Sequence, residues 1–378
     1  MKRALSITSL TLCVACAGAN TVDPSRADPS GAVPTASPSA SGSAPLSGGA
    51  PSNSAASADP KAKQDASPPK TAEADAGAKP APTKARAFKG TTFPPADFTP
   101  PFERSAQAGD GHWEAVSAAG GVNGKPIMFR TSLRPHLFKR FAFVNVVAID
   151  LSHTEIHLVP GTHEPETKAL PQSERTGLVP AEVQPRLAAI FNGGFMTKHG
   201  GHGMGLGDVD LLPPRDELCT VALLDDGHVR IGTWSKISAE KQRFRAWRQG
   251  PWCLLEDSVV NPNVTNGQQR KYGMSAEGKM EIRRSAVGVS ADGGTLYYAV
   301  GEEQTPELLA KAMQVLGVPN ATQLDINWSY TRFFWFGGGQ DGKLEVVETL
   351  LPKMKHRKTG YVTKAEPRDF FYVLRGRR

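Results

Sequence analysis

Four short segments of the chain carry side chains suited to chemistry. Asn192-Gly193-Gly194 follows an apolar run, and paired glycines let a backbone approach a ligand closely. Gly250-Pro251 opens a second segment. Arg284 precedes another apolar run, where a planar guanidinium can bind a phosphate. Asp325 ends a short apolar run and can serve as general acid or base, nucleophile or metal ligand. Taken singly, each segment suits an ordinary turn or a solvated charge equally well.

Further candidates surround Asp325. Asn327, Trp328 and Ser329 follow it with an amide, an aromatic ring and a hydroxyl, so we expect them to contact substrate. Glu302 is a candidate second carboxylate, because glycoside hydrolysis usually needs two; solvated surface charge is the alternative. We expect most of the aromatic run after Asp325 to be core, with a few rings available to stack on a sugar. The run comprises Trp328, Tyr330, Phe333, Phe334, Trp335 and Phe336.

A glycine-rich segment offers a competing metal hypothesis. His199 and His202 stand three residues apart, with Asp208 nearby, and these types bind metals. Loops rich in glycine preset ligands poorly, however. A flexible loop over the substrate is therefore the favoured interpretation, and we expect neither a metal nor a cofactor.

Together, the order and spacing of these segments resemble the phosphodiester glycosidase domain family. Its pattern has an Asn-Gly-Gly-Phe turn, a Gly-Pro segment, Arg-Thr-Ala-(Ile/Val)-Gly, a hairpin, a helix ending in Leu-Gly, and Leu-Asp-Gly-Gly-Gly-Ser. The resemblance covers roughly residues 143–336. Its matching segments are Asn192-Gly193-Gly194-Phe195, Gly250-Pro251, Arg284-Ser285-Ala286-Val287-Gly288, Leu316-Gly317 and Leu324-Asp325.

This resemblance implies a glycosidase, a hydrolase that acts on a sugar phosphodiester, and the signal-like N-terminus described below would make it an exported one. Asp325 would be the catalytic carboxylate, Arg284 would steady the phosphate, and Asn192 with its two glycines would line the sugar pocket. One departure is marked, because Asp325-Ile326-Asn327-Trp328-Ser329 replaces the family's Asp-Gly-Gly-Gly-Ser. Either the pocket is reshaped for another substrate, or the domain is a catalytically inactive glycan-binding module.

Short apolar runs between turn signals predict many strands. Asp225-Asp226-Gly227 and Asp292-Gly293-Gly294 each separate two such runs and predict hairpins. Residues 306–316 predict a helix, with Thr305 as its cap, and a second helix is expected near 238–247. These elements predict an α+β fold: one large domain with a mixed or largely antiparallel sheet and a few packed helices.

The N-terminal quarter of the chain differs from the rest. Residues 1–19 resemble a bacterial lipoprotein signal, with Cys16 as the lipidated residue; an ordinary secretory signal is the alternative. Residues 20–87 are mostly Ala, Ser, Pro and Gly, and every Phe, Trp and Tyr lies at or after Phe88, so this stretch predicts a disordered tether. We expect residues 88–140 to be a lead-in that packs on a domain at 141–378 and buries Trp113, Phe129 and Phe138.

Composition excludes several classes. No segment after the signal reaches ~18 consecutive apolar residues, which argues against a multi-span membrane protein. Four cysteines are too few for a disulfide-stapled mini-fold. The net charge of +7 comes without a nucleic-acid motif, so we expect a glycan or sugar-phosphodiester partner in a bacterial envelope, and membrane attachment through the lipid anchor. Whether Cys219 and Cys253 pair stays open.

Overall fold

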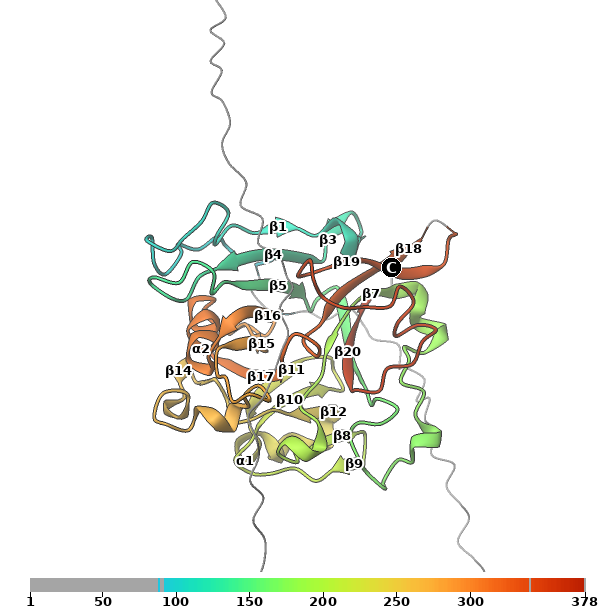
Figure 1. Cartoon of the computed structure of the whole chain (residues 1–378). Coiled ribbons are helices and arrows are strands. Elements are labelled where there is room, and N and C mark those ends of the chain that lie inside the picture. Colours follow the sequence, from blue (N-terminus) through green and yellow to red (C-terminus); the bar gives the residue numbers. More distant parts are fainter. Residues whose placement is uncertain (1–87, 89–91, 340, 377–378) are drawn as a thin grey trace, which may run out of the picture. The chain divides into compact units, whose positions relative to one another are not determined.

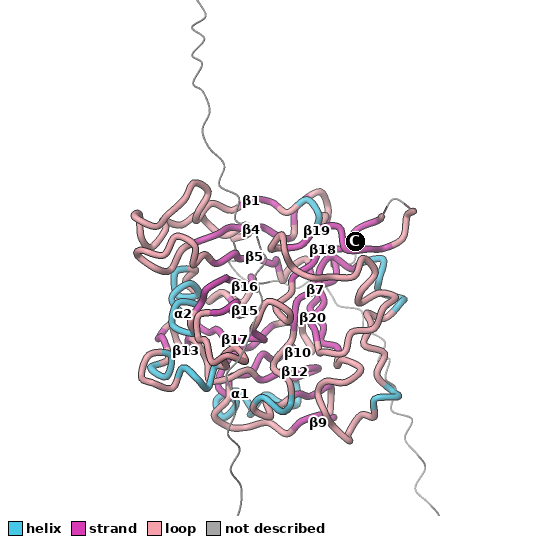
Figure 2. The backbone as a smooth tube through the Cα atoms, viewed as in Figure 1, coloured by secondary structure: helices cyan, strands magenta, loops and turns pink. Residues whose placement is uncertain are grey.

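The computed structural model describes Phe88, residues 92–339 and residues 341–376, all within one unit, Glu73–Arg378. About 37% of it is strand and 15% helix, and strands clearly outweigh helices in Figure 2. The strands of its four sheets pair antiparallel. The predicted α+β class is therefore wrong: this is a mainly β fold. The predicted signal, the lipidation site Cys16 and the tether lie outside the described residues.

The largest sheet has eight strands in the order β1-β4-β5-β16-β15-β17-β13-β14, and most of them follow one another from top to bottom in Figure 1. Cross-strand pairing confirms the hairpin predicted at Asp292-Gly293-Gly294, which joins β15 to β16. The strands are β1 (Glu114–Ala115), β4 (Met128–Leu133), β5 (Val144–Asp150), β13 (Leu255–Glu256), β14 (Val259–Val260), β15 (Ile282–Val289), β16 (Thr295–Gln304) and β17 (Asn320–Ile326).

Two five-stranded sheets complete the β structure, together with the small hairpin of β2 (Gly121–Val122) and β3 (Lys125–Pro126). The first, the β10 sheet, runs β11-β10-β12-β8-β9: Val229–Thr233, Cys219–Leu224, Phe244–Gln249, Met204–Leu206 and Val209–Leu212. The second, the β7 sheet, runs β19-β18-β7-β20-β6: Leu344–Thr349, Phe333–Gly338, Leu187–Asn192, Phe370–Arg375 and Thr154–Val159. The hairpin predicted at Asp225-Asp226-Gly227 joins β10 to β11.

Among the described residues, α2 (Pro306–Val315) is the only α-helix longer than α1 (Trp234–Ile237). It confirms the helix predicted over 306–316, and the Thr305 hydroxyl caps it by accepting a hydrogen bond from the Leu308 amide at 3.2 Å. Its buried face packs on the eight-stranded sheet. The remaining helical segments are 3₁₀ turns: Ser117–Ala119, Gln172–Glu174, Ala181–Arg186, Thr197–His199, Ser238–Arg243, Pro262–Val264 and Gln269–Tyr272.

The second predicted helix, near 238–247, is wrong. Ser238–Arg243 forms a 3₁₀ turn, and the chain then enters β12, which lies between β10 and β8. Phe244 and Trp247 are buried against Trp234 and neighbouring side chains. This local core and the backbone hydrogen bonds of β12 to β10 and β8 override the weak helical pattern.

One large core connects the sheets, with aromatic rings of β7, β18 and β20 packed against β5, β15 and β16. The predicted lead-in at 88–140 is not separate from this fold, because β4 pairs with β5 along its whole length. Trp113 is buried and Phe129 half-buried as expected, but Phe138 is exposed. No helix among the described residues has both the length and the apolar character to cross a bilayer.

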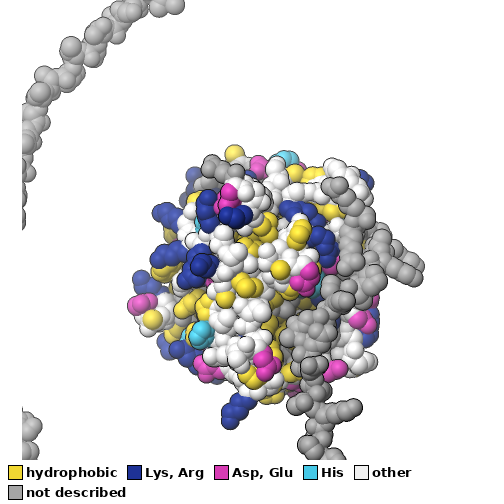
Figure 3. All heavy atoms as spheres, turned by 90° about the vertical axis from the view of Figure 1, so that its right-hand side faces the viewer, with side chains coloured by type: hydrophobic (Ala, Val, Ile, Leu, Met, Phe, Trp, Pro, Cys, Tyr) yellow, Lys and Arg dark blue, Asp and Glu magenta, His cyan; other side chains and the backbone are white. Residues whose placement is uncertain are grey.

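The side chains of Cys219 and Cys253 form a disulfide, which answers the question left open by the sequence. Cys219 begins β10, and Cys253 lies just before β13, so the bond ties the β10 sheet to the eight-stranded sheet. The face on the right-hand side of Figure 1 carries groups of Lys and Arg side chains toward its upper and left margins, with acidic groups scattered among them (Figure 3).

Candidate functional site

Asp325 lies near the end of β17, where the eight-stranded sheet meets the end of β7. Its amide donates to the Gly193 carbonyl at 3.1 Å, and its carbonyl accepts the Ser285 hydroxyl at 2.7 Å. Its carboxylate accepts the Ile326 amide at 2.8 Å and is ion-paired with Arg368. These bonds fix a buried carboxyl at the junction of two sheets.

Burial raises the pKa of the Asp325 carboxyl to about 7, because the ionised form loses its hydration. Arg368 and the Ile326 amide oppose this rise, while the nearby Asp369 adds to it. The carboxyl is therefore partly protonated near neutral pH. A group in this state can donate or accept a proton under physiological conditions, as general acid–base catalysis requires.

Asn192 and its two glycines lie beside Asp325, but their polar groups bond to other groups of the protein. The Asn192 side chain donates to Ser285 at 3.1 Å and to the Gly193 carbonyl at 3.0 Å, and accepts from the Tyr298 hydroxyl at 2.8 Å. Its carbonyl oxygen also accepts the Arg332 amide at 3.0 Å. Asn192 therefore joins the two sheets beneath the site.

Gly193 and Gly194 are required by a buried ion pair. A Cβ on Gly193 would lie 1.9 Å from Asp369 Oδ2, and one on Gly194 would lie 2.7 Å from Arg248 Cζ. Asp369 Oδ2 accepts the Gly194 amide at 2.9 Å and Arg248 Nε at 3.0 Å. The glycines thus let this ion pair lie against bare backbone.

The Arg248–Asp369 pair is fully buried yet incompletely satisfied. Arg248, on β12, also donates to the carbonyls of His202 and Phe195 at 2.8 Å and 2.5 Å. Asp369 Oδ1 has no hydrogen-bond partner among the described residues. A buried carboxylate oxygen without a donor is costly, so such atoms are candidates for contact with a ligand or water.

Arg368 closes the pocket above Asp325. Its Nη2 donates to the carboxylate of Asp325 and to the Gly194 carbonyl at 3.2 Å, and its guanidinium lies 4.5 Å from the ring centre of Tyr330. Its Nε and Nη1 have no hydrogen-bond partner within the described part of the chain. These N–H groups can therefore donate to a ligand.

These groups line one small pocket of about 20 Å³, which is room for roughly one water molecule. A sugar can enter only if Tyr330 and Arg368 move away from Asp325. Arg332 stays fixed below, bound to Tyr361 and Glu366 at 2.9 Å each. The pocket is lined by Asn192, Gly193, Asp325, Tyr330, Arg332, Tyr361, Glu366, Arg368, Asp369 and Phe370.

Arg284 does not line this pocket, and its surroundings do not fit the phosphate role predicted for it. The side chain is fully buried, and burial lowers its pKa to about 9. Its donors are taken up by protein acceptors, so none remains for a phosphate. The acceptors are the carbonyls of Tyr272, Gly273, Met280 and Gln304 and the side chain of Gln323.

The remaining predicted contacts lie outside the pocket. Glu302 is ion-paired with Arg283, with a 2.7 Å bond from Arg283 Nε. Asn327 begins the loop after β17 with a φ of +70°. Trp328 is exposed beneath Lys355, whose ammonium lies 4.4 Å from the ring centre, and the Ser329 carbonyl accepts from Arg332.

The two histidines of the metal hypothesis occupy different environments. His202 is buried, and burial together with Arg248 and Arg215 lowers its pKa to about 3. His199 lies in a 3₁₀ turn and is exposed. Within the described ranges, no group of three or more His, Cys, Asp or Glu side chains is placed to hold a metal ion.

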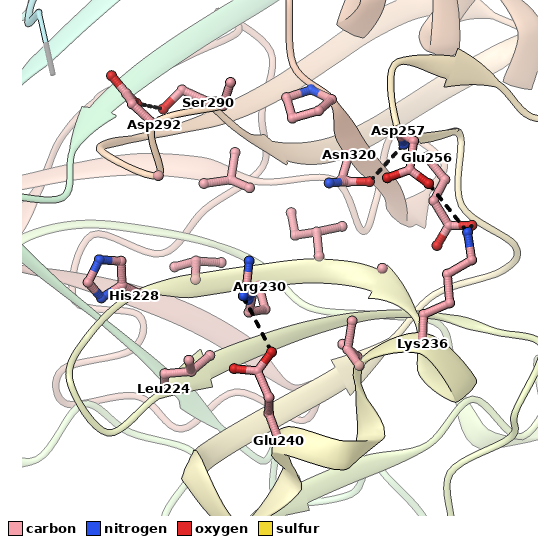
Figure 4. Close-up of a pocket in the computed structure, with 18 of the residues that line it drawn as sticks. Leu224, His228, Arg230, Lys236, Glu240, Glu256, Asp257, Ser290, Asp292 and Asn320 are labelled. Carbon is pink, nitrogen blue, oxygen red and sulfur yellow. Dashed lines mark hydrogen bonds and ion pairs between the residues drawn. The ribbon is translucent and has the colours of Figure 1, made fainter. Parts of the chain in front are cut away.

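A larger cavity of about 550 Å³ lies elsewhere, between β11 and the turn from β15 to β16, and none of the predicted site residues is among its described lining. Its charged side chains pair with one another, as Arg230 does with Glu240 and Lys236 with Glu256 (Figure 4). The two acidic members of those pairs are thus neutralised within the wall.

Sequence reasoning missed Arg368 and Asp369. The available signal was the charged segment Glu366-Pro367-Arg368-Asp369 directly before an apolar strand, the same arrangement that drew attention to Arg284. Arg248 gave no signal, because nothing in its neighbourhood indicates that it pairs with a residue near the opposite end of the chain.

Comparison with known proteins gives a fold-level resemblance only. No family model matches the chain, and no curated protein matches it. Among solved structures, the zebrafish N-acetylglucosamine-1-phosphodiester α-N-acetylglucosaminidase catalytic domain is similar at 15% identity and a TM-score of 0.41, covering 70% of this chain and 88% of that one.

Two further solved structures resemble the chain with lower TM-scores. A Synechocystis protein has 14% identity and a TM-score of 0.40, covering 66% of this chain and 62% of that one. A Burkholderia pseudomallei protein has 13% identity and a TM-score of 0.30, covering 62% and 74%.

Proposed function

We propose that this chain hydrolyses a sugar phosphodiester at the pocket around Asp325. The observation that carries the proposal is the meeting of three groups there: a buried carboxyl with a pKa near neutrality, a second carboxylate at Asp369, and the unpaired N–H groups of Arg368. The order of the sequence motifs supports the same activity. Export and lipid attachment at Cys16 belong to the proposal as its cellular setting.

Each group has a distinct part in the reaction. Arg368 binds the phosphate through Nη1. Asp369, ion-paired with Arg248, accepts a proton from a water molecule that attacks the anomeric carbon. The bond between that carbon and the phosphate oxygen breaks, and the leaving oxygen takes the proton of Asp325. One water is consumed, and a free sugar and a phosphomonoester are released.

The test uses the full chain with N-acetylglucosamine phosphodiesters and phosphorylated cell-wall glycans in ¹⁸O-labelled water. We expect the label in the released sugar. Asp325→Asn and Asp369→Asn should each lower turnover by about 10²–10⁴-fold. Asp257→Asn is the matched control, since Asp257 is exposed and lies outside the pocket. Label in the phosphate would instead indicate cleavage of the phosphoester bond.

A non-catalytic glycan-binding module is the second candidate, and the small pocket favours it. Exposed Trp328 beside Lys355 would then stack on a sugar outside the closed pocket. This alternative predicts saturable binding to a glycan array without product release, weakened by Trp328→Ala and unaffected by Asp325→Asn. Turnover that depends on Asp325 would dismiss it.

A further inference from the structure

Exposed large apolar side chains gather at one end of the eight-stranded sheet. Among the described residues, eight large apolar side chains are exposed, and five of them come from two loops. The loop between β4 and β5 contributes Leu137, Phe138 and Phe141, the last two 63% and 60% exposed. The loop between β17 and β18 contributes Trp328 (53%) and Tyr330 (38%).

Strand register places both loops at the same end. Leu133, at the end of β4, pairs with Val144 at the start of β5, and Val144 pairs with Gly301 on β16. Gly301 pairs with Arg284 on β15, and Arg284 pairs with Ile326, which ends β17. The exposed rings thus border the end of the sheet that holds Asp325, and Tyr330 itself lines the pocket.

Cations accompany these rings. The Arg104 guanidinium lies 4.9 Å from the ring centre of Phe138, and the Lys355 ammonium 4.4 Å from that of Trp328. Lys353 and Arg357 extend the second group along an exposed loop, and neither is ion-paired within the described part of the chain. Lys139 and Arg283 neutralise Glu281 and Glu302 nearby.

Exposed aromatic rings flanked by unpaired cations suit the boundary of an anionic bilayer. Rings enter the headgroup layer while Lys and Arg remain at the charged surface, where each adds to the attraction. We infer that this end of the sheet, formed by the 137–141 loop, Trp328, Tyr330 and the 353–357 loop, docks on an anionic lipid surface. A protein partner fits less well, because two separate loop tips do not form the continuous surface that a stable protein interface buries.

The surface borders the pocket through Tyr330, but lipid binding can be measured apart from catalysis. If the proposed function is right, docking would turn the pocket mouth toward the bilayer and favour phosphodiesters displayed there. That consequence rests on the proposed function, whereas lipid binding itself does not. Vesicle binding is therefore measured without substrate, so that failure of one proposal leaves the other standing.

The experiment measures co-sedimentation of the full chain with phosphatidylglycerol vesicles and with phosphatidylcholine vesicles. Phe138→Ser combined with Phe141→Ser should lower the partition coefficient on anionic vesicles at least about tenfold. Lys353→Ala combined with Arg357→Ala should lower it about fivefold per cation, with the loss shrinking at high salt. Every variant keeps the same N-terminus, so its contribution to binding cancels in the ratio.

The matched control is Val209→Ser combined with Val259→Ser, which removes exposed apolar side chains elsewhere and should leave partitioning unchanged. Quenching of Trp fluorescence by brominated lipid should fall in Trp328→Phe. Equal partitioning of the wild type and both loop variants would overturn the inference. So would self-association of the chain without vesicles that the Phe variants abolish, because the surface would then bind a second copy.

Discussion

Arg284 and Arg368 both bring a guanidinium below the protein surface, but their surroundings differ. Arg284 gives its donors to carbonyls and one amide side chain, and it fastens the 272–280 loop to the sheet. Within the residues that the structure describes, Arg368 leaves Nε and Nη1 without hydrogen-bond partners, and it faces a carboxyl whose pKa is near neutrality. A satisfied buried charge indicates scaffolding, whereas an unsatisfied one beside a shifted carboxyl indicates a site.

The largest expected effect comes from removing each arginine in turn. Arg284→Met should lower the free energy of unfolding by about 3–5 kcal/mol, since several buried carbonyls lose their donor. Arg368→Met should cost less than this, because the buried Asp325 carboxyl left without its ion-pair partner can take up a proton, and the other losses are one hydrogen bond to the Gly194 carbonyl and the contact with Tyr330. Urea unfolding of both variants measures the contrast.

For activity we expect the reverse: the Arg368 variant should lose more turnover than the Arg284 variant. Arg368→Met is expected to lower kcat/KM on a sugar phosphodiester at least about a hundredfold, since the phosphate loses its charged partner. Arg284→Lys that still folds should retain most of the turnover. If Arg284→Lys folds normally but no longer turns over substrate, the original assignment of Arg284 to the phosphate would return.

The next effect concerns pH. The pKa of Asp325 is about 7 in the folded chain against 3.8 in the unfolded chain, so the unfolded state loses this proton first as pH rises. The contribution of Asp325 to stability is therefore full below about pH 3.8 and falls by up to about 1.4 kcal/mol per pH unit until about pH 7. Asp325→Asn should remove this slope from a series of urea melts.

The same carboxyl should appear in the rate profile. If Asp325 donates its proton to the leaving group, kcat should decline above about pH 7 as the acid form disappears. A matched variant, Asp257→Asn, should leave both the stability slope and the rate profile as in the wild type. A slope that persists in Asp325→Asn would assign the titration to another group.

A smaller effect on stability and turnover should distinguish a Gly→Ala change in the pocket from one at the surface. Gly193→Ala puts a methyl group 1.9 Å from Asp369 Oδ2, so the Arg248–Asp369 pair must shift. We expect a loss of about 1–3 kcal/mol in stability and a further loss of turnover. Gly338→Ala is the control, because its Cβ would meet nothing within 4 Å. Equal melting temperatures for the two variants would contradict this account.

Local signals in the sequence predicted the parts of this fold that local chemistry determines. The Asp-Gly turns located both hairpins, and Thr305 with Pro306 located α2. Residues 238–247 were misassigned because β12 owes its conformation to neighbours on both sides. The α+β class was wrong because it included the helix expected over 238–247, where the fold forms a 3₁₀ turn and a strand instead.

The sequence likewise indicates some residues of the candidate site and not others. Asp325 was recognised because a carboxylate at the end of an apolar run is visible in the sequence. Asp369 and Arg248 were not, because their pairing joins positions far apart in the chain. The role of Arg284 could not be decided either, since it depends on whether nearby carbonyls or a ligand take its donors, and only the folded loop answers that.

The smallest expected effect decides which residue is the second carboxylate. Glu302 is partly exposed and ion-paired with Arg283, so Glu302→Gln should cost less than about 1 kcal/mol of stability. Turnover should stay near that of the wild type, because Glu302 lies outside the pocket that holds Asp369 and Asp325. Side-by-side kcat values for Glu302→Gln and Asp369→Asn provide the measurement. A collapse of turnover in Glu302→Gln alone would instead assign the second carboxylate to Glu302 on β16, and Asp369 would then serve only as the ion-pair partner of Arg248.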